Sequence, residues 1–372
     1  MEKKSVLFIC GHGDTLINFR KEFIKCFINL EYKVYAIAPE ISNLQLRELQ
    51  IMGVEYIEIN FQRKGVNPFD LLKSIFFVVK EIKKINPALV FSYTHKSVLI
   101  GSLASYFSGI DEVYSMITGR GHIFDQENIY KKIRRFFGIL SFKIALKNNK
   151  KVFFQNPDDI ELFLENKALR KEQVFMVNGS GVNLDYFKQE NLPEGLNFLC
   201  AARLLKSKGL LEFAEAFKIF NDEFPHAKAY IAGAPDDHDD SLPIDEIKHQ
   251  WKHKYGVEYI GHFNDIREAI KLSSVFVLLS YNEGTPRSVL EAMAMGRPIL
   301  TTDVSGCRET VIQGKNGYLV KVKDPINAAE MMKNYVDKEK RMIMGGESRK
   351  MCEKKYDVNE VNKNLLQQMN VC

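Results

Sequence analysis

The chain has 372 residues, of which 45% are hydrophobic and 27% charged, so it is a globular protein too long for one ordinary core. Its charge is uneven, because residues 1–188 hold 27 Lys/Arg against 20 Asp/Glu, and this basic half is expected to meet an anionic partner. Six scattered cysteines without a Cys-x-x-Cys pair argue against a disulfide framework or a zinc site. The sequence also lacks the run of roughly 18 apolar residues that a membrane span requires.

Apolar runs of strand length alternate with helical patterns from the N-terminus onward. The seven runs of the first half span residues 6–10, 34–38, 56–61, 89–93, 113–117, 152–154 and 174–177. Between them, apolar residues recur at helical spacing, as from Phe69 to Ile82. Continuous apolar strands joined by helices predict a parallel sheet covered on both faces.

A polar stretch at residues 189–195, with Pro193 and Gly195 as breakers, divides this series from a second one. The six runs of the second series span residues 198–202, 229–232, 257–260, 275–279, 299–301 and 318–320. Two successive α/β series predict two doubly wound, Rossmann-like domains that face each other across a cleft.

The stretch from Glu283 to Glu291 places two carboxylates around a turn between a predicted strand and a predicted helix. Ligands of open α/β sheets bind in the crevice at the carboxyl ends of the strands, and a helix start offers N–H groups to a phosphate. Two acceptors for sugar hydroxyls beside an anion site suit a nucleotide-sugar. The alternative is a strand–turn–helix whose glutamates are merely solvated.

Arg203 and Lys208 flank a turn after another predicted strand, where two cations can clamp a diphosphate and stabilise it as it departs. Lys206, on the same turn, is expected to be a solvated surface cation. Gly261 ends a further strand, and a glycine there lets the backbone approach a planar base.

The first half offers weaker signals at the ends of its own strands. Gly13 lies in a Gly-His-Gly turn that lacks the third glycine of a dinucleotide fingerprint but can open a cleft toward a transferred sugar. His95 follows the strand at 89–93 and is expected to orient an acceptor or to hydrogen-bond a donor sugar, unless it is structural.

Residues 128–157 carry eight Lys/Arg and no acid, and the helix that they predict has an apolar stripe. The stripe residues are Ile129, Ile133, Phe136, Phe137, Leu140 and Ile144. This helix lies on an anionic membrane surface, or its stripe packs into the core behind a solvated basic back, or both hold, with the stripe inward and the cations facing lipid. The acidic run 236–240 is expected to be a solvated loop and not a metal site.

Together, Arg203, Lys208, Gly261 and the run EGTPRSVLEAMAMGRPI at 283–299 resemble the donor half of retaining GT-B glycosyltransferases of family GT4. The similarity covers essentially the whole chain. Thr94-His95-Lys96-Ser97 and Thr118-Gly119-Arg120-Gly121 resemble the bacterial branch that elongates polyprenol-diphosphate-linked sugars, including its α-1,3-N-acetylgalactosaminyltransferases. Arg120 is a departure, because that branch commonly has a smaller apolar residue there.

The resemblance implies a role for each matching position. Residues 1–188, with a C-terminal tail from about 355 to 372, would bind the acceptor, and residues 189–354 would bind the donor. Arg203 and Lys208 would hold the donor diphosphate, Glu283 a sugar hydroxyl and Glu291 the ribose. The remaining donor contacts would come from Gly13, Gly261, Thr285, Pro286, Ser288 and Val289, with His95 among the catalytic residues.

The expected function is therefore hexosyl transfer, with retention, from a UDP-sugar to a polyprenyl-diphosphate-linked saccharide in the assembly of a bacterial surface glycan. The expected sugar is GalNAc or another N-acetylhexosamine. We expect no resident cofactor, metal or nucleic acid, and a peripheral location on the cytoplasmic face of the plasma membrane. The alternative functions are a UDP-sugar epimerase of the same fold and a non-catalytic binding module.

Overall fold

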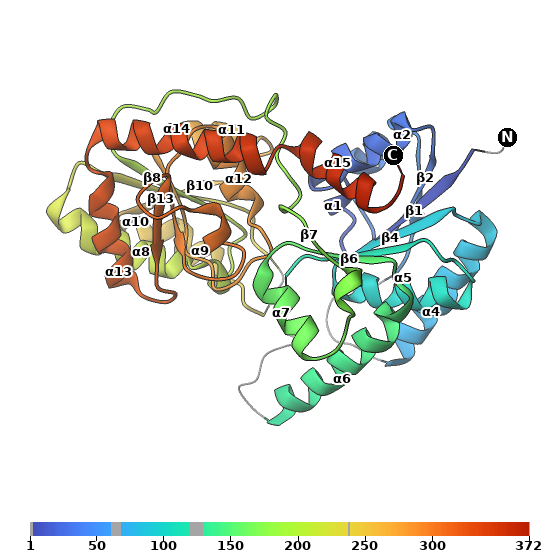
Figure 1. Cartoon of the computed structure of the whole chain (residues 1–372). Helices are drawn as coiled ribbons and strands as arrows, with labels where there is room; N and C mark the ends of the chain where they lie inside the picture. Colours follow the sequence, from blue (N-terminus) through green and yellow to red (C-terminus); the bar gives the residue numbers. More distant parts are fainter. Residues whose placement is uncertain (1–2, 61–67, 120–128, 237–238, 372) are drawn as a thin grey trace. The chain divides into compact units, whose positions relative to one another are not determined.

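The computed structural model describes residues 3–60, 68–119, 129–236 and 239–371 (Figure 1). The chain divides into two compact units: unit 1 comprises residues 1–180 and 359–372, and unit 2 comprises residues 181–358. The segment 181–188 belongs to unit 2 because Val182 forms a bridge with Asp357 and its amide donates to the Tyr356 carbonyl at 2.8 Å. The polar stretch at 189–195 therefore lies inside unit 2.

Within its described residues, unit 1 contains a sheet of parallel strands in the order β3-β2-β1-β4-β5-β6-β7. The strands are β1 (Ser5–Cys10), β2 (Lys33–Ala38), β3 (Val54–Glu58), β4 (Leu89–Tyr93), β5 (Val113–Ile117), β6 (Lys151–Phe154) and β7 (Val174–Met176). The expected strand at 56–61 was placed too late, because Gly53 turns the chain with a φ of +80° and pairing begins at Val54.

Helices cover both faces of this sheet, as its continuously buried central strands require (Figure 1). They are α1 (Thr15–Asn18), α2 (Lys21–Asn29), α3 (Asn43–Ile51), α4 (Pro68–Ile85), α5 (His95–Phe107), α6 (Ile129–Ala145), α7 (Pro157–Glu165) and α15 (Val358–Gln368). On β5, Ile117 packs with α5, α6 and α7, whereas its neighbour Met116 faces the core that includes α2 and α15. Unit 1 is therefore doubly wound.

The C-terminal helix α15 completes the core of unit 1 although it is distant in sequence. Val361, Leu365 and Met369 are buried against side chains of β1 and α2. The Tyr114 hydroxyl on β5 donates to the Met369 carbonyl at 2.9 Å. The last residues of the chain are thus part of the first folding unit.

Helix α6 presents part of its apolar stripe to solvent. Phe136, Phe137, Leu140 and Ile144 are exposed, whereas Phe142 and Ala145 are buried against α5 and β6. The interpretation in which the whole stripe packs into the core is wrong, because the buried face of the helix is the one that contains Phe142. The side chains of residues 129–134 lie outside the described part of the chain. Among the described residues, the helices are too short or too polar to cross a membrane.

Unit 2 has its own parallel sheet, in the order β10-β9-β8-β11-β12-β13 within the part that the structure describes. Its strands are β8 (Asn197–Ala201), β9 (Lys228–Ala232), β10 (Val257–Gly261), β11 (Val275–Leu278), β12 (Ile299–Thr302) and β13 (Gly317–Val320). Its helices are α8 (Leu210–Glu223), α9 (Ile244–His249), α10 (Trp251–Tyr255), α11 (Ile266–Lys271), α12 (Arg287–Ala294), α13 (Pro325–Met332) and α14 (Lys338–Lys355). The expected strands of the second half are all present, with ends that differ by one residue at most. The predicted fold class, with two doubly wound α/β domains, is confirmed.

The Tyr335 side chain links β12 and β13 of this second sheet by hydrogen bonds. It ends the 3₁₀ turn η6 (Lys333–Tyr335), and its side chain is fully buried. Its hydroxyl donates to the Ile299 carbonyl on β12 at 2.7 Å and accepts from the Tyr318 amide on β13 at 3.1 Å. One phenol therefore satisfies a backbone group on each of two neighbouring strands.

We expect Tyr335→Phe to lower the free energy of unfolding of unit 2 by about 1–3 kcal/mol, because it leaves two buried or half-buried backbone groups without this partner. Denaturant unfolding measures the change. Tyr230→Phe on β9 is the matched control and should cost less than about 0.5 kcal/mol, as changes away from such contacts usually do. Equal stabilities of the two variants would contradict this role of the hydroxyl.

Candidate functional site

The two sheets each have a point where the strand order reverses, and ligands of open α/β sheets bind at that point. In unit 2, β8 lies between β9 and β11, so this point lies where β8 and β11 end. Arg203 and Lys208 follow β8, and Glu283 follows β11. Residues 80 positions apart are thus brought to one edge of one sheet.

A glycine holds the loop after β8 against the end of β11. Gly209 has a φ of +69°, and a Cβ there would lie 2.0 Å from the backbone oxygen of Leu279. Only glycine permits this approach. It ends the turn η4 (Lys206–Lys208) and starts α8, which places Lys208 beside the β11 loop.

Lys208 and Glu283 form an ion pair within the candidate site. The Lys208 Nζ lies 2.5 Å from the Glu283 Oε1, and the side chains are only 19% and 15% exposed. The Glu283 amide donates to the Ser305 carbonyl at 3.1 Å, which fixes the β11 loop to the segment after β12. Sequence reasoning missed the adjacent Gly306, whose Cβ position would lie 2.2 Å from the Gly284 oxygen. A Ser-Gly pair in the turn that follows a strand was a usable signal.

Arg203 is paired with a carboxylate from the loop that follows β9. Its Nη1 lies 2.6 Å from the Asp236 Oδ2. In the same loop, the Asp240 Oδ2 accepts from the Ser207 amide at 2.9 Å. The expectation of a solvated loop at 236–240 is therefore wrong for Asp236 and Asp240. Asp237 and His238 lie outside the described residues.

Glu291 lies in the second turn of α12, one turn after Arg287. The Arg287 Nε donates to the Glu291 Oε1 at 2.8 Å. Burial raises the pKa of the Glu291 carboxyl, and the nearby Arg287 guanidinium opposes that rise. Arg287 was missed as a site residue, although its i,i+4 spacing to Glu291 was visible in the sequence.

The remaining expected donor contacts lie at the start of α12 and the end of β10. Thr285 and Pro286 precede the first turn of α12, and the Val289 amide donates to the Pro286 carbonyl at 3.1 Å. Ser288 is the second residue of that helix. Gly261 ends β10 with a φ of +91°, and its carbonyl accepts from the Gly233 amide at 2.9 Å.

The candidate residues of unit 1 also meet at a reversal of strand order, between β1 and β4. A Cβ on Gly13 would lie 2.6 Å from the Pro39 oxygen, so glycine is required there. Gly11, two residues earlier, donates its amide to the Thr94 Oγ1 at 3.2 Å, which joins the two loops. Arg120, by contrast, lies outside the described residues.

His95 begins α5, directly after Thr94. Its ring contacts Phe142 of α6 at 5.7 Å between centroids, and burial lowers the pKa of the imidazole to about 4. The ring is therefore neutral at pH 7. Its Nε2 is buried and has no hydrogen-bond partner among the described residues.

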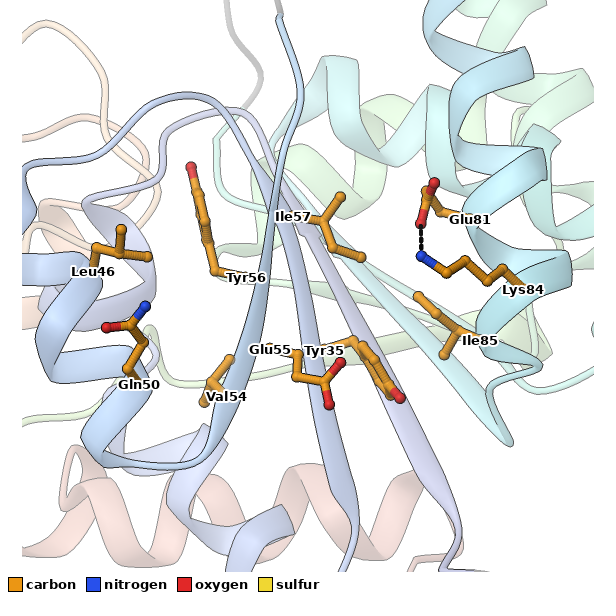
Figure 2. A pocket seen from close by; sticks show the side chains of 10 residues that line it. All are labelled: Tyr35, Leu46, Gln50, Val54, Glu55, Tyr56, Ile57, Glu81, Lys84 and Ile85. Atoms are coloured by element: carbon orange, nitrogen blue, oxygen red, sulfur yellow. Dashed lines mark ion pairs between the residues drawn. The ribbon is translucent and has the colours of Figure 1, made fainter.

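A cavity of about 380 Å³ lies beside the edge strand β3 (Figure 2). Its lining comes from β2, β3, α3 and α4 and contains none of the expected site residues. The Tyr56 hydroxyl that borders it donates to the carbonyls of Ala38 and Pro39. This cavity is separate from both points where the strand order reverses. In the described ranges, three or more His, Cys, Asp or Glu side chains do not gather as they would around a metal ion.

The model of the family "Glycosyl transferases group 1" matches residues 183–355, which lie within unit 2. A Campylobacter jejuni protein, the N,N'-diacetylbacillosaminyl-diphospho-undecaprenol alpha-1,3-N-acetylgalactosaminyltransferase, is 27% identical over 96% of each chain. An Escherichia coli protein, the UDP-Gal:alpha-D-GlcNAc-diphosphoundecaprenol alpha-1,3-galactosyltransferase, is 24% identical over 68% of this chain and 67% of its own.

The crystal structure of Anabaena HepE in complex with UDP and glucose has the same fold, with a TM-score of 0.76 at 16% identity, over 99% of this chain and 100% of that one. Its likeness extends through both units. This structural likeness, the matched family model and the two α/β sheets all agree with the resemblance to GT4 glycosyltransferases that the sequence showed. Residues 183–355 belong to the group 1 glycosyl transferases, family GT4, and the whole chain has the GT-B fold.

Proposed function

We propose that this glycosyltransferase moves an N-acetylhexosamine, with retention, from a UDP-sugar to a saccharide carried on polyprenyl diphosphate. The observation that carries the proposal is the convergence of Arg203, Lys208 and Glu283 where the strand order of unit 2 reverses. Two cations suit a diphosphate, and a neighbouring carboxylate suits a sugar hydroxyl. A binding module would have little use for a clamp on a leaving group.

In this proposal, each part of the donor has its own contact residues, beginning with the diphosphate. Arg203 and Lys208 neutralise the diphosphate, and Glu283 accepts from a hydroxyl of the transferred sugar. Glu291 accepts from the ribose, and the backbone near Gly261 meets the uracil. Since the Val289 amide is already bonded to Pro286, the helix-start contact to phosphate falls on Ser288, with Thr285 and Pro286 shaping the turn.

Retention follows from a reaction on one face of the sugar. The bond from the anomeric carbon to the UDP oxygen breaks while the bond to the acceptor hydroxyl forms on the same face. The acceptor proton passes to an oxygen of the leaving diphosphate, whose charge Arg203 and Lys208 stabilise. In unit 1, the neutral His95 is the proposed hydrogen-bonding partner of a sugar hydroxyl. No divalent ion is required when two side-chain cations carry this charge.

The acceptor and sugar are inferred from the named activities of the relatives. The Campylobacter jejuni and Escherichia coli proteins are named for acceptors on diphospho-undecaprenol, which supports a polyprenyl-diphosphate acceptor here. The first of them is named for GalNAc, which supports an N-acetylhexosamine donor. The reaction would belong to the assembly of a surface glycan, such as O-antigen, capsule or a glycoprotein glycan, on the cytoplasmic face of the membrane.

The exposed face of α6 supports a peripheral membrane contact. Phe136, Leu140 and Ile144 recur every four residues and lie exposed on one side of the helix. Lys143 and Lys147 are exposed nearby in the sequence. An apolar stripe with flanking cations suits the interface of an anionic bilayer. A lipid-linked acceptor would then be met at the surface where it resides.

We expect Arg203→Ala and Lys208→Ala each to lower turnover roughly 10²–10³-fold, because a preorganised charge stabiliser of the leaving group is lost. Release of UDP from a UDP-sugar in the presence of a polyprenyl-diphosphate acceptor measures it. Lys206→Ala, an exposed cation on the same turn, is the control and should retain near-normal turnover. If all three variants turn over alike, the clamp is assigned to the wrong residues.

We expect the affinity for UDP-N-acetylglucosamine to fall as the pH is lowered. The fall should begin at a higher pH than the range in which exposed glutamates titrate. The folded-state pKa of Glu291 is raised by burial, so its carboxylate is lost as pH falls through that raised pKa, and the ribose hydroxyls lose their acceptor. Calorimetry at several pH values measures the affinity. A UDP-sugar is used because the terminal phosphate of UDP itself titrates near pH 6.

Glu291→Gln should weaken this binding roughly tenfold at neutral pH and abolish the acid dependence, since hydrogen bonds to charged groups contribute about 1.5–3 kcal/mol. The control is Glu268→Gln, an exposed site on α11. A parental affinity and pH profile in Glu291→Gln would remove this residue from the ribose site.

We expect the triple variant Phe136→Ser, Leu140→Ser and Ile144→Ser to bind anionic vesicles at least about tenfold more weakly, since each buried apolar side chain contributes about 1.5–3 kcal/mol. Sedimentation with phosphatidylglycerol vesicles measures the binding. Affinity for UDP should not change, because these residues and the donor residues lie in different units. The control is Phe69→Ser with Phe76→Ser, which removes exposed apolar groups from α4. Equal losses in both variants would show that α6 is not the specific contact.

A further inference from the structure

The loop after β9 is bound along the loop after β8 by its backbone. Leu204 donates its amide to the Ala234 carbonyl at 3.0 Å and accepts from the Leu242 amide at 2.8 Å. The Lys206 amide donates to the Asp240 carbonyl at 2.9 Å. These bonds hold the described part of the loop in place independently of any ion pair.

The carboxylate of Asp236 is therefore held beside Arg203 by the loop and not only by the charge that it meets. Its side chain is 22% exposed, whereas that of Arg203 is 59% exposed. The Ser241 hydroxyl donates to the Asp236 carbonyl oxygen and so braces the backbone of this residue. Asp236 is the more fixed member of the pair, and the long arginine is the member that can turn toward a ligand.

A bound donor would affect the Arg203–Asp236 pair differently from the Lys208–Glu283 pair. Glu283 has a ligand group of its own in the proposed function, a sugar hydroxyl. Asp236 has none, and its negative charge lies next to the cation that the diphosphate requires. An incoming diphosphate must draw Arg203 away from Asp236 and remain near that carboxylate.

We propose that Asp236 is an exchangeable counter-ion of the donor site, which neutralises Arg203 when the site is empty and recaptures it when the nucleoside diphosphate leaves. The inference rests on the proposed function, because it requires a diphosphate at Arg203. Asp236 then acts as a positioning residue that keeps product affinity low. It does not contact the reacting atoms.

The test compares the binding of UDP and of uridine to the intact chain by calorimetry. Asp236→Asn should tighten UDP binding on the order of three- to tenfold, which corresponds to removing one unit charge a few ångströms from the diphosphate in a largely solvated site. Uridine binding should stay unchanged, because the nucleoside carries no charge, and added salt should reduce the gain. Asp236→Glu should resemble the parent protein. Asp222→Asn, an exposed carboxylate on α8, is the control for net charge.

The opposite results overturn the proposal. If Asp236→Asn leaves UDP affinity unchanged or weakens it while uridine binds normally, Asp236 is not a competitor of the diphosphate. If uridine binding also changes, the residue acts through the structure of the loop. Asp236→Ser is a second variant that must agree with Asp236→Asn. Failure of the proposed function gives a different pattern, in which the parent protein does not bind UDP or Arg203→Ala binds it as well as the parent.

Discussion

The donor half of this protein depends on one contact between backbone segments. The chain at Gly209 lies so close to the carbonyl of Leu279 that a side chain cannot be accommodated, and this contact locks the loop after β8 to the end of β11. Lys208 precedes that glycine, and Glu283 follows the β11 strand within a few residues. Their ion pair is a consequence of this backbone arrangement. The parallel pairing of β8 and β11 holds the same two segments together within the sheet.

A second general feature of the candidate site is that its charges are balanced before a ligand arrives. Three side-chain cations each have a carboxylate within hydrogen-bonding distance. The pairs are Arg203 with Asp236, Lys208 with Glu283, and Arg287 with Glu291. Charges that are partly removed from water are costly unless they are paired, so a dense polar crevice is stable only in this form. A charged ligand binds such a site by exchanging partners.

The sequence predicted the fold well because parallel strands buried on both faces appear as continuous apolar runs, which glycine and polar turns separate. The carboxyl ends of the strands were equally predictable, since strand–turn–helix boundaries mark them, and Arg203, Lys208, Glu283 and Glu291 were named on that basis. The partner of Arg203 was not predictable, because Asp236 reaches it through a loop from another strand. Burial of one face of α6 was not predictable either, since an amphipathic pattern does not say which of two apolar edges packs.

The division of the chain has a consequence for the order in which the protein folds during synthesis. Unit 2 is one continuous segment, 181–358, whereas unit 1 needs α15, which follows unit 2 in the sequence, to cover part of its core. Domains fold as units as they emerge from the ribosome. All residues of unit 2 are therefore translated before unit 1 is complete, because unit 1 still needs α15. Loss of α15 would therefore damage the core of unit 1 and leave the sheet of unit 2 intact.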